Sequence, residues 1–76
     1  MKEWNLEDLK EKLRMFLGED KISKVVDGAL EKANLPKKSS YPREEMHKLL
    51  DILIEQGGFV EFVARNFKVK VLLEKD

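Results

Sequence analysis

The only histidine of the chain, His47, lies among carboxylates that could join it in a metal site or in acid–base chemistry. Its acidic neighbours are Glu44, Asp51 and Glu55, and on a helix Asp51, four residues further on, would share its face. A protein zinc site needs three or four ligands, usually histidine and cysteine, and the chain has no cysteine. His47 also falls beside the apolar stripe of its segment. We therefore expect a half-exposed surface histidine and no metal site.

Other catalytic patterns are missing as well. Without cysteine there is no thiolate nucleophile, and the sequence contains no glycine-rich phosphate loop and no arrangement typical of a serine hydrolase. The adjacent acids Glu44 and Glu45 stand at the expected start of a helix, where the helix dipole favours negative side chains. We therefore expect no catalytic residue, no cofactor and no enzymatic activity.

Basic residues gather in two zones of a chain whose net charge is zero, with fifteen basic and fifteen acidic residues. Residues 32–43 hold four basic residues and no acidic one, and residues 65–70 hold Arg65, Lys68 and Lys70. A neutral chain lacks the broad positive field that drives general binding to phosphate. The two zones could contact nucleic acid if the fold made them one face, or they could simply be solvated.

The segment GGFVEFVARNFKVKVLL, residues 57–73, is richer in apolar residues than one face of a helix requires. Read as a helix, its apolar positions form a single face that includes Val60, Val63, Phe67 and Val71. Read as a strand, the alternation over 67–73 is imperfect, and a lone strand would lack a pairing partner. We predict a helix over 59–72, and leave helix or strand open for residues 68–73.

Part of this segment, GFVEFVARNFKV at residues 58–69, resembles the Fis-type DNA-binding domains. The matching positions are Gly58, Val60, Ala64, Arg65 and Val69. The resemblance implies a helix-turn-helix-like domain in residues 42–76 that binds nucleic acid. However, Lys68 stands where a glycine normally makes the turn, and residues 70–76 are mainly apolar and then acidic, whereas base recognition needs polar donors. Nucleic-acid binding is therefore the alternative function.

Our main functional hypothesis rests on the excess of apolar side chains, which four short helices cannot all bury. We expect an exposed stripe with a basic rim, the candidate partner-binding residues being Phe62, Arg65, Lys68, Val69, Lys70, Leu72 and Leu73. The alternative places Phe59, Phe62 and Phe67 in the core. The stripe predicts a non-enzymatic protein–protein interaction module, such as a small subunit, adaptor or regulatory domain. Self-association into a homodimer through the C-terminal helix is its simplest form.

The elements that must position these residues are predicted to form an all-α, compact bundle of four short helices in a single domain, 1–76. The predicted helices span 6–17, 20–34, 42–56 and 59–72, with a long basic loop at 35–42. The apolar stripe expected to be buried on the first helix consists of Leu6, Leu9, Leu13, Phe16 and Leu17. Asn5 is expected to cap the first helix and Asp20 the second. Gly18 is expected to end the first helix in the left-handed conformation, Asn34 and Pro36 are expected to end the second, and the pair Gly57–Gly58 the third.

The remaining composition indicates a soluble, cytoplasmic protein. The opening MKEWNLEDLK lacks the apolar core of a signal peptide, and no stretch approaches the ~18 apolar residues of a membrane span. The absence of threonine, the single glutamine and the abundance of lysine and glutamate are typical of thermophile proteins.

Overall fold

Helices make up most of the chain in the computed structural model, which describes residues 2–74. The helices are α1 (Leu6–Leu13), α2 (Glu19–Lys32), α3 (Arg43–Glu55) and α4 (Gly58–Leu73), and two short strands are β1 (Glu3–Asn5) and β2 (Ser40–Pro42). The prediction of four helices is confirmed, and α4 is helical throughout residues 68–73. The prediction of an all-α fold is wrong, because β1 and β2 form a two-stranded antiparallel sheet.

The sheet pairs Trp4 with Tyr41, and both side chains are buried. On either side of this pair the strands carry exposed or half-buried residues, so each strand alternates as a half-buried strand should. Three residues are too few for this alternation to be visible in the sequence. The partner strands are also separated by the whole of α1 and α2, so nothing local indicates the pairing.

Tyr41 fixes the basic loop that precedes α3. Its hydroxyl donates a hydrogen bond to the carbonyl oxygen of Pro36 at 2.7 Å and accepts one from the backbone N–H of Lys38 at 3.0 Å. The ammonium group of Lys38 lies 5.1 Å from the centre of the tyrosine ring. The loop is therefore anchored to the core by one buried side chain.

The start of α1 is as predicted, but its end is not. The side chain of Asn5 accepts a hydrogen bond from the backbone N–H of Glu7 at 2.7 Å, which confirms the cap. The regular helix ends at Leu13, before the expected residue 17, and residues 14–17 continue as tighter turns. Gly18 has an extended backbone, with φ −76°, and precedes α2 as its N-cap, so it is not a left-handed stop.

The junction between α1 and α2 is held by a charged side chain. The guanidinium group of Arg14 donates hydrogen bonds to Glu19 and to Glu7, which raise the pKa of Arg14 above its ordinary value, that with Glu19 contributing most. Asp20, the predicted cap of the second helix, instead lies inside the first turn of α2. Its acidic side chain is still favourable there because the positive end of the helix dipole is near.

The other two predicted stops are confirmed. Asn34 has φ 59° just after α2, and Gly57 and Gly58 have φ 77° and 61° between α3 and α4. Left-handed backbone is strained for most residues and accessible to glycine, so this pair can reverse the chain within two residues. The reversal lays α4 directly against α3.

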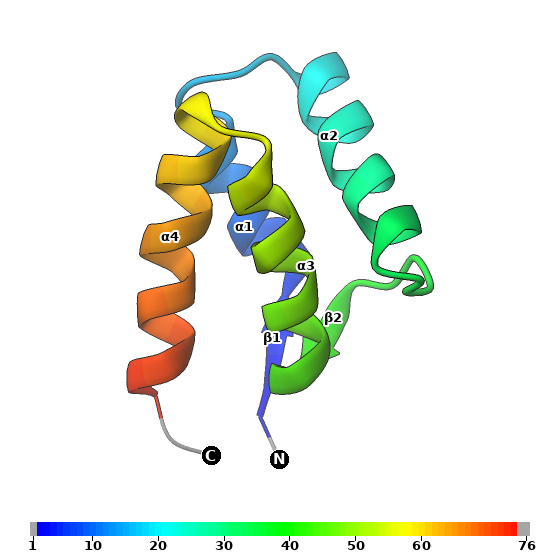
Figure 1. Cartoon of the computed structure of the whole chain (residues 1–76), viewed down its shortest axis with the longest axis vertical. Helices are drawn as coiled ribbons and strands as arrows, with labels where there is room; N and C mark the ends of the chain where they lie inside the picture. The colour runs from blue at the N-terminus through cyan, green and yellow to red at the C-terminus, as the bar shows by residue number, and fades with distance from the viewer. Residues whose placement is uncertain (1, 75–76) are drawn as a thin grey trace.

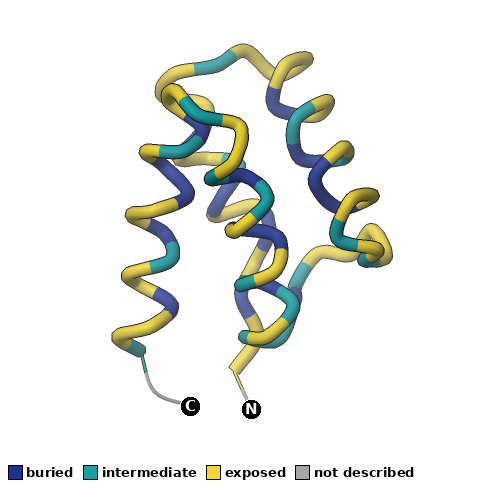
Figure 2. Tube along the Cα trace, viewed as in Figure 1, coloured by how far each residue is buried: buried dark blue, intermediate teal, exposed yellow. Residues whose placement is uncertain are grey.

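Helix α3 occupies the centre of the molecule, with α2 on one side and α4 on the other (Figure 1). Helix α1 lies behind α3 and also contacts α4. The buried side of each helix faces this centre, as the dark segments in Figure 2 show. Helix α4 therefore forms one lateral edge of the molecule, and its outer side faces no other element among residues 2–74.

The role of Tyr41 can be tested by replacing it with phenylalanine. Because Tyr41→Phe leaves a part-buried carbonyl and N–H without the hydroxyl, we expect the free energy of unfolding to fall by about 1–2 kcal/mol. Chemical denaturation measures this change. Ser40→Ala is the matched control, since the Ser40 hydroxyl donates to the exposed carboxylate of Glu3, and its effect should stay within about 0.5 kcal/mol. Equal effects of the two variants would contradict the anchoring role.

Candidate interaction surface

Helix α4 has two apolar sides, and only one of them is buried in the core. The inner side consists of Val60, Val63, Ala64, Phe67 and Val71. Phe67 is only 1% exposed, and its ring meets that of Trp4 edge to face at a centroid distance of 6.4 Å. The sequence left three phenylalanines open between core and surface, and the structure places Phe67 in the core.

The other two phenylalanines lie outside, where the end of α1 meets the start of α4. Phe59 and Phe62 are 59% and 58% exposed. The ring of Phe16 stacks on Phe59 at 4.8 Å and meets Phe62 edge to face at 6.2 Å. We call Phe16, Phe59, Phe62 and the neighbouring Met15 the aromatic cluster. With Gly58, its three rings line a shallow, almost wholly apolar groove.

The structure corrects the sequence analysis at Phe16 and adds Met15 to the exposed apolar residues. The helical period predicted Phe16 on the buried stripe of the first helix, and this is wrong. Since α1 ends at Leu13, the following turns carry Phe16 out to the surface, where it is exposed. Met15 is also exposed, and like Phe59 it was absent from the predicted partner-binding set. No residue of the sequence indicates that α1 ends early, and for this reason the sequence analysis did not predict the exposure of Phe16.

The far end of α4 carries a second group of exposed apolar residues. Val69, Leu72 and Leu73 are all exposed, Leu73 to 76%, and we call them the aliphatic end. Asn66 separates this group from Phe62, and its side-chain amide donates to the Phe62 carbonyl oxygen at 3.0 Å. All four apolar residues of the predicted stripe therefore reach the surface, and none is absorbed by the core.

The aromatic cluster and the aliphatic end together make one extended surface. From the usual areas of such side chains, the two groups together expose roughly 700 Å² of apolar surface, which is large for a monomer of this size. Charged residues border this surface. The guanidinium of Arg65 pairs with Glu61 at 2.7 Å, and the ammonium of Lys68 pairs with Asp51 at 2.5 Å.

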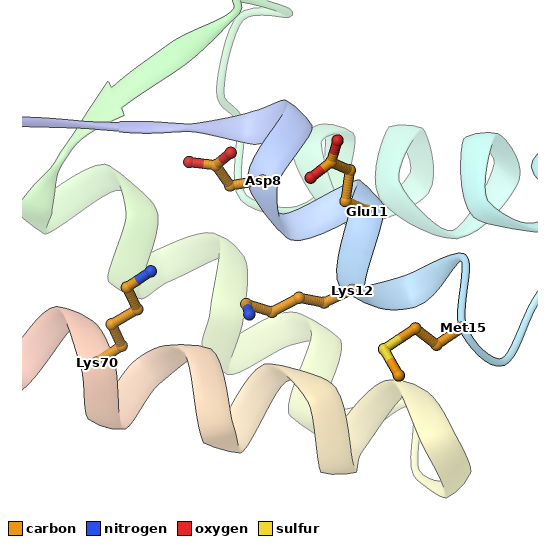
Figure 3. A pocket seen from close by; sticks show the side chains of 5 residues that line it. All are labelled: Asp8, Glu11, Lys12, Met15 and Lys70. Carbon is orange, nitrogen blue, oxygen red and sulfur yellow. The ribbon is translucent and has the colours of Figure 1, made fainter.

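The opposite border is formed by α1. Figure 3 shows Lys12 of α1 and Lys70 of α4 reaching into the gap between the two helices, while Met15 lies over the first turns of α4. Asp8 and Glu11 of α1 complete this pocket. The three predicted rim cations therefore lie on both borders of the apolar surface.

The basic loop has acidic partners of its own. The ammonium groups of Lys37 and Lys38 lie 3.4 Å from carboxylates of Asp27 and Glu45. Exposed pairs of this kind add little stability, but each carboxylate offsets a positive charge locally. Helix α4 also continues without a break through Lys68, where the Fis-type pattern has its turn. Residues 75–76, which belong to the helix-turn-helix-like domain that the resemblance implied, lie outside the described residues.

His47 is half-buried, close to the half-exposed state expected of it. Within residues 2–74, no three potential metal ligands come together, and no helix there has the length and hydropathy needed to cross a bilayer. Comparisons of the chain with family models, with curated proteins and with solved structures found no match. The functional argument therefore rests on the geometry of the surface itself.

The separation of α4 into an inner and an outer side predicts that substitutions at Val71 and at Leu73 change stability by different amounts. Val71 is fully buried, so Val71→Ala should lower the free energy of unfolding by about 2 kcal/mol. Leu73→Ala removes more carbon atoms from an exposed site and should change it by less than about 0.5 kcal/mol in dilute solution. Denaturation of both variants gives the comparison. A larger loss for Leu73→Ala would mean that the aliphatic end belongs to the core.

Proposed function

We propose that this chain is a non-enzymatic protein–protein interaction module that associates through the outer side of α4 and the adjoining end of α1. The observation that carries the proposal is the exposure of seven large apolar side chains in the aromatic cluster and the aliphatic end. Their roughly 700 Å² approaches the ~800 Å² that each partner contributes to a standard protein interface. Self-association into a homodimer is the simplest form, because one surface then serves both partners.

The composition of this surface supports a protein partner. Phenylalanine, methionine and arginine are enriched at interface centres, whereas lysine and glutamate are more common at rims. Here Phe16, Phe59 and Phe62 form the middle of one half, and the pairs Arg65–Glu61 and Lys68–Asp51 form the border. Stacked rings are also rigid, so few side-chain rotations are lost when a partner covers them.

The same residues offer no chemistry beyond association. The groove over the aromatic cluster is lined by Phe16, Gly58, Phe59 and Phe62, none of which can act as an acid, a base or a nucleophile. A cytoplasmic location is part of the proposal, since a highly charged chain without cysteine suits a reducing, aqueous compartment.

Light scattering after size exclusion tests the association. The chain has a mass of 8.9 kDa, and we expect twice this value, falling to the monomer mass on dilution. Phe62→Glu should give a monomer at every concentration with an unchanged circular dichroism spectrum, because it places a charge in the middle of the surface. Ser23→Glu, on the exposed side of α2 at the opposite edge, is the matched control and should remain a dimer.

A wild-type chain that stays monomeric up to millimolar concentration would exclude the homodimer. A dimer that is equally stable in Phe62→Glu would place the interface elsewhere and contradict the proposed surface.

Nucleic-acid binding by residues 42–76 is the competing proposal, and it makes a different prediction. Because Lys37, Lys38, Arg65 and Lys68 each lie beside a carboxylate, we expect no binding to a generic DNA duplex, even at low salt. Fluorescence anisotropy of a labelled duplex measures this. Binding that weakens steeply with added salt, and that is lost in Lys37→Glu, would favour the competing function.

A further inference from the structure

Five exposed residues of α4 form one row along the helix, namely Phe59, Phe62, Asn66, Val69 and Leu73, which are separated by three, four, three and four residues. Gly58, Arg65, Lys70 and Leu72 are also exposed and lie beside this row. The spacing within the row is that of the positions that meet when two helices pack side by side as in a coiled coil. The inner side of α4, in contrast, is occupied by the core.

We propose that the partner is a second copy of this chain, whose α4 packs antiparallel against the first. This inference rests on the proposed self-association and adds the orientation and register of the helices. In this arrangement Leu73 of each copy lies opposite Phe62 of the other, and Val69 lies opposite Asn66. The two-fold axis then passes between residues 67 and 68, in the C-terminal half of α4.

Charge pattern separates this arrangement from a parallel one. Arg65 and Lys70 flank the row of outward-facing residues on its two sides, and both are exposed. In a parallel pair, each Arg65 would lie beside Lys70 of the other copy, which places like charges together twice. Reversal of one helix removes both contacts. Arg65 then lies beside Leu72 of the second copy, and Lys70 beside Val63.

The antiparallel arrangement also accounts for Leu72, which is exposed but lies outside the regular row. The aliphatic part of an arginine side chain can cover an apolar neighbour while its charged end stays in water. Arg65 of the second copy, already paired with its own Glu61, is placed to cover Leu72 in this way. The parallel arrangement leaves Leu72 without such a cover.

Asn66 is the one polar member of the row, and its contacts suit this packing. Its amide donates to the Phe62 carbonyl of its own helix, so that N–H already has a partner when Val69 of the second copy covers it. A single polar residue among apolar ones opposes sliding of one helix along the other. Phe59 lies at the N-terminal end of the row, stacked on Phe16 of its own copy. In the antiparallel pair the dipoles of the two helices also point in opposite directions, which is electrostatically favourable.

Cysteine cross-linking tests the orientation directly, because the chain contains no cysteine of its own. Phe62→Cys and Leu73→Cys are made separately, one of them with a size tag, and then mixed and mildly oxidised. We expect a disulfide between the two different variants in the mixture and none in either variant alone. In the antiparallel pair, the two copies of residue 73 lie about 16 Å apart along the helices, beyond the reach of a disulfide.

Since Phe62→Cys removes part of the apolar row, a second pair leaves the row intact. Arg65→Cys and Leu72→Cys should be joined by a short bismaleimide only when the two are mixed. Ser23→Cys, on the far edge of the molecule, is the control and should not cross-link.

Each outcome bears on one of the two proposals. Cross-links of Phe62→Cys and Leu73→Cys with themselves would show a parallel pair, which overturns the orientation and leaves self-association standing. A dimer by light scattering without any of these cross-links places the interface away from α4 and overturns the inference. A strictly monomeric wild-type chain overturns the homodimer, and the inference falls with it.

Discussion

The whole structure depends on the burial of one helix, α3, by nearly all the others. Met46, Leu49, Leu50 and Leu53 of this helix are fully buried, and α2, α4 and both strands pack around them. A chain of 76 residues has enough apolar material for only one such centre. Every surrounding element therefore buries the one side that faces α3. Apolar residues on the other side of a surrounding helix have no place inside the molecule.

Helix α4 is the element with the most apolar residues on its outer side, and the course of α1, which follows the sheet, adds further apolar residues beside them. The strand that contains Trp4 leads directly into α1, and its pairing with Tyr41 sets where α1 starts. Helix α1 then runs along α4 and ends beside the first turn of α4. This course brings Phe16 onto Phe59 and so extends the apolar side of α4 into a broader surface. The exposed apolar surface therefore includes residues that follow α1 as well as residues of α4.

Much of the fold could be predicted because its signals are local. The four helices follow from apolar periodicity, and Asn5, Asn34 and the Gly57–Gly58 pair act through their own backbone or side chain. The sheet could not be predicted, since Trp4 and Tyr41 are far apart in the sequence and each strand is very short. The exposed stripe on α4 was predicted because its segment has more apolar residues than one buried face requires, and such an excess can be counted in the sequence. The contribution of Phe16 was not, because it depends on where α1 ends.

The long separation between the two strands also bears on the order in which the chain can fold. Glu3 and Ser40, whose side chains are hydrogen-bonded across the sheet, are 37 residues apart, whereas α3 and α4 are joined by a two-residue turn. Closing the larger loop costs more chain entropy, so the hairpin of α3 and α4 is favoured as the early nucleus and the sheet as a late step. During synthesis, the first strand must then wait for more than half of the chain to emerge before it finds its partner. Changes at Trp4 should accordingly act on the unfolding rate more than on the folding rate.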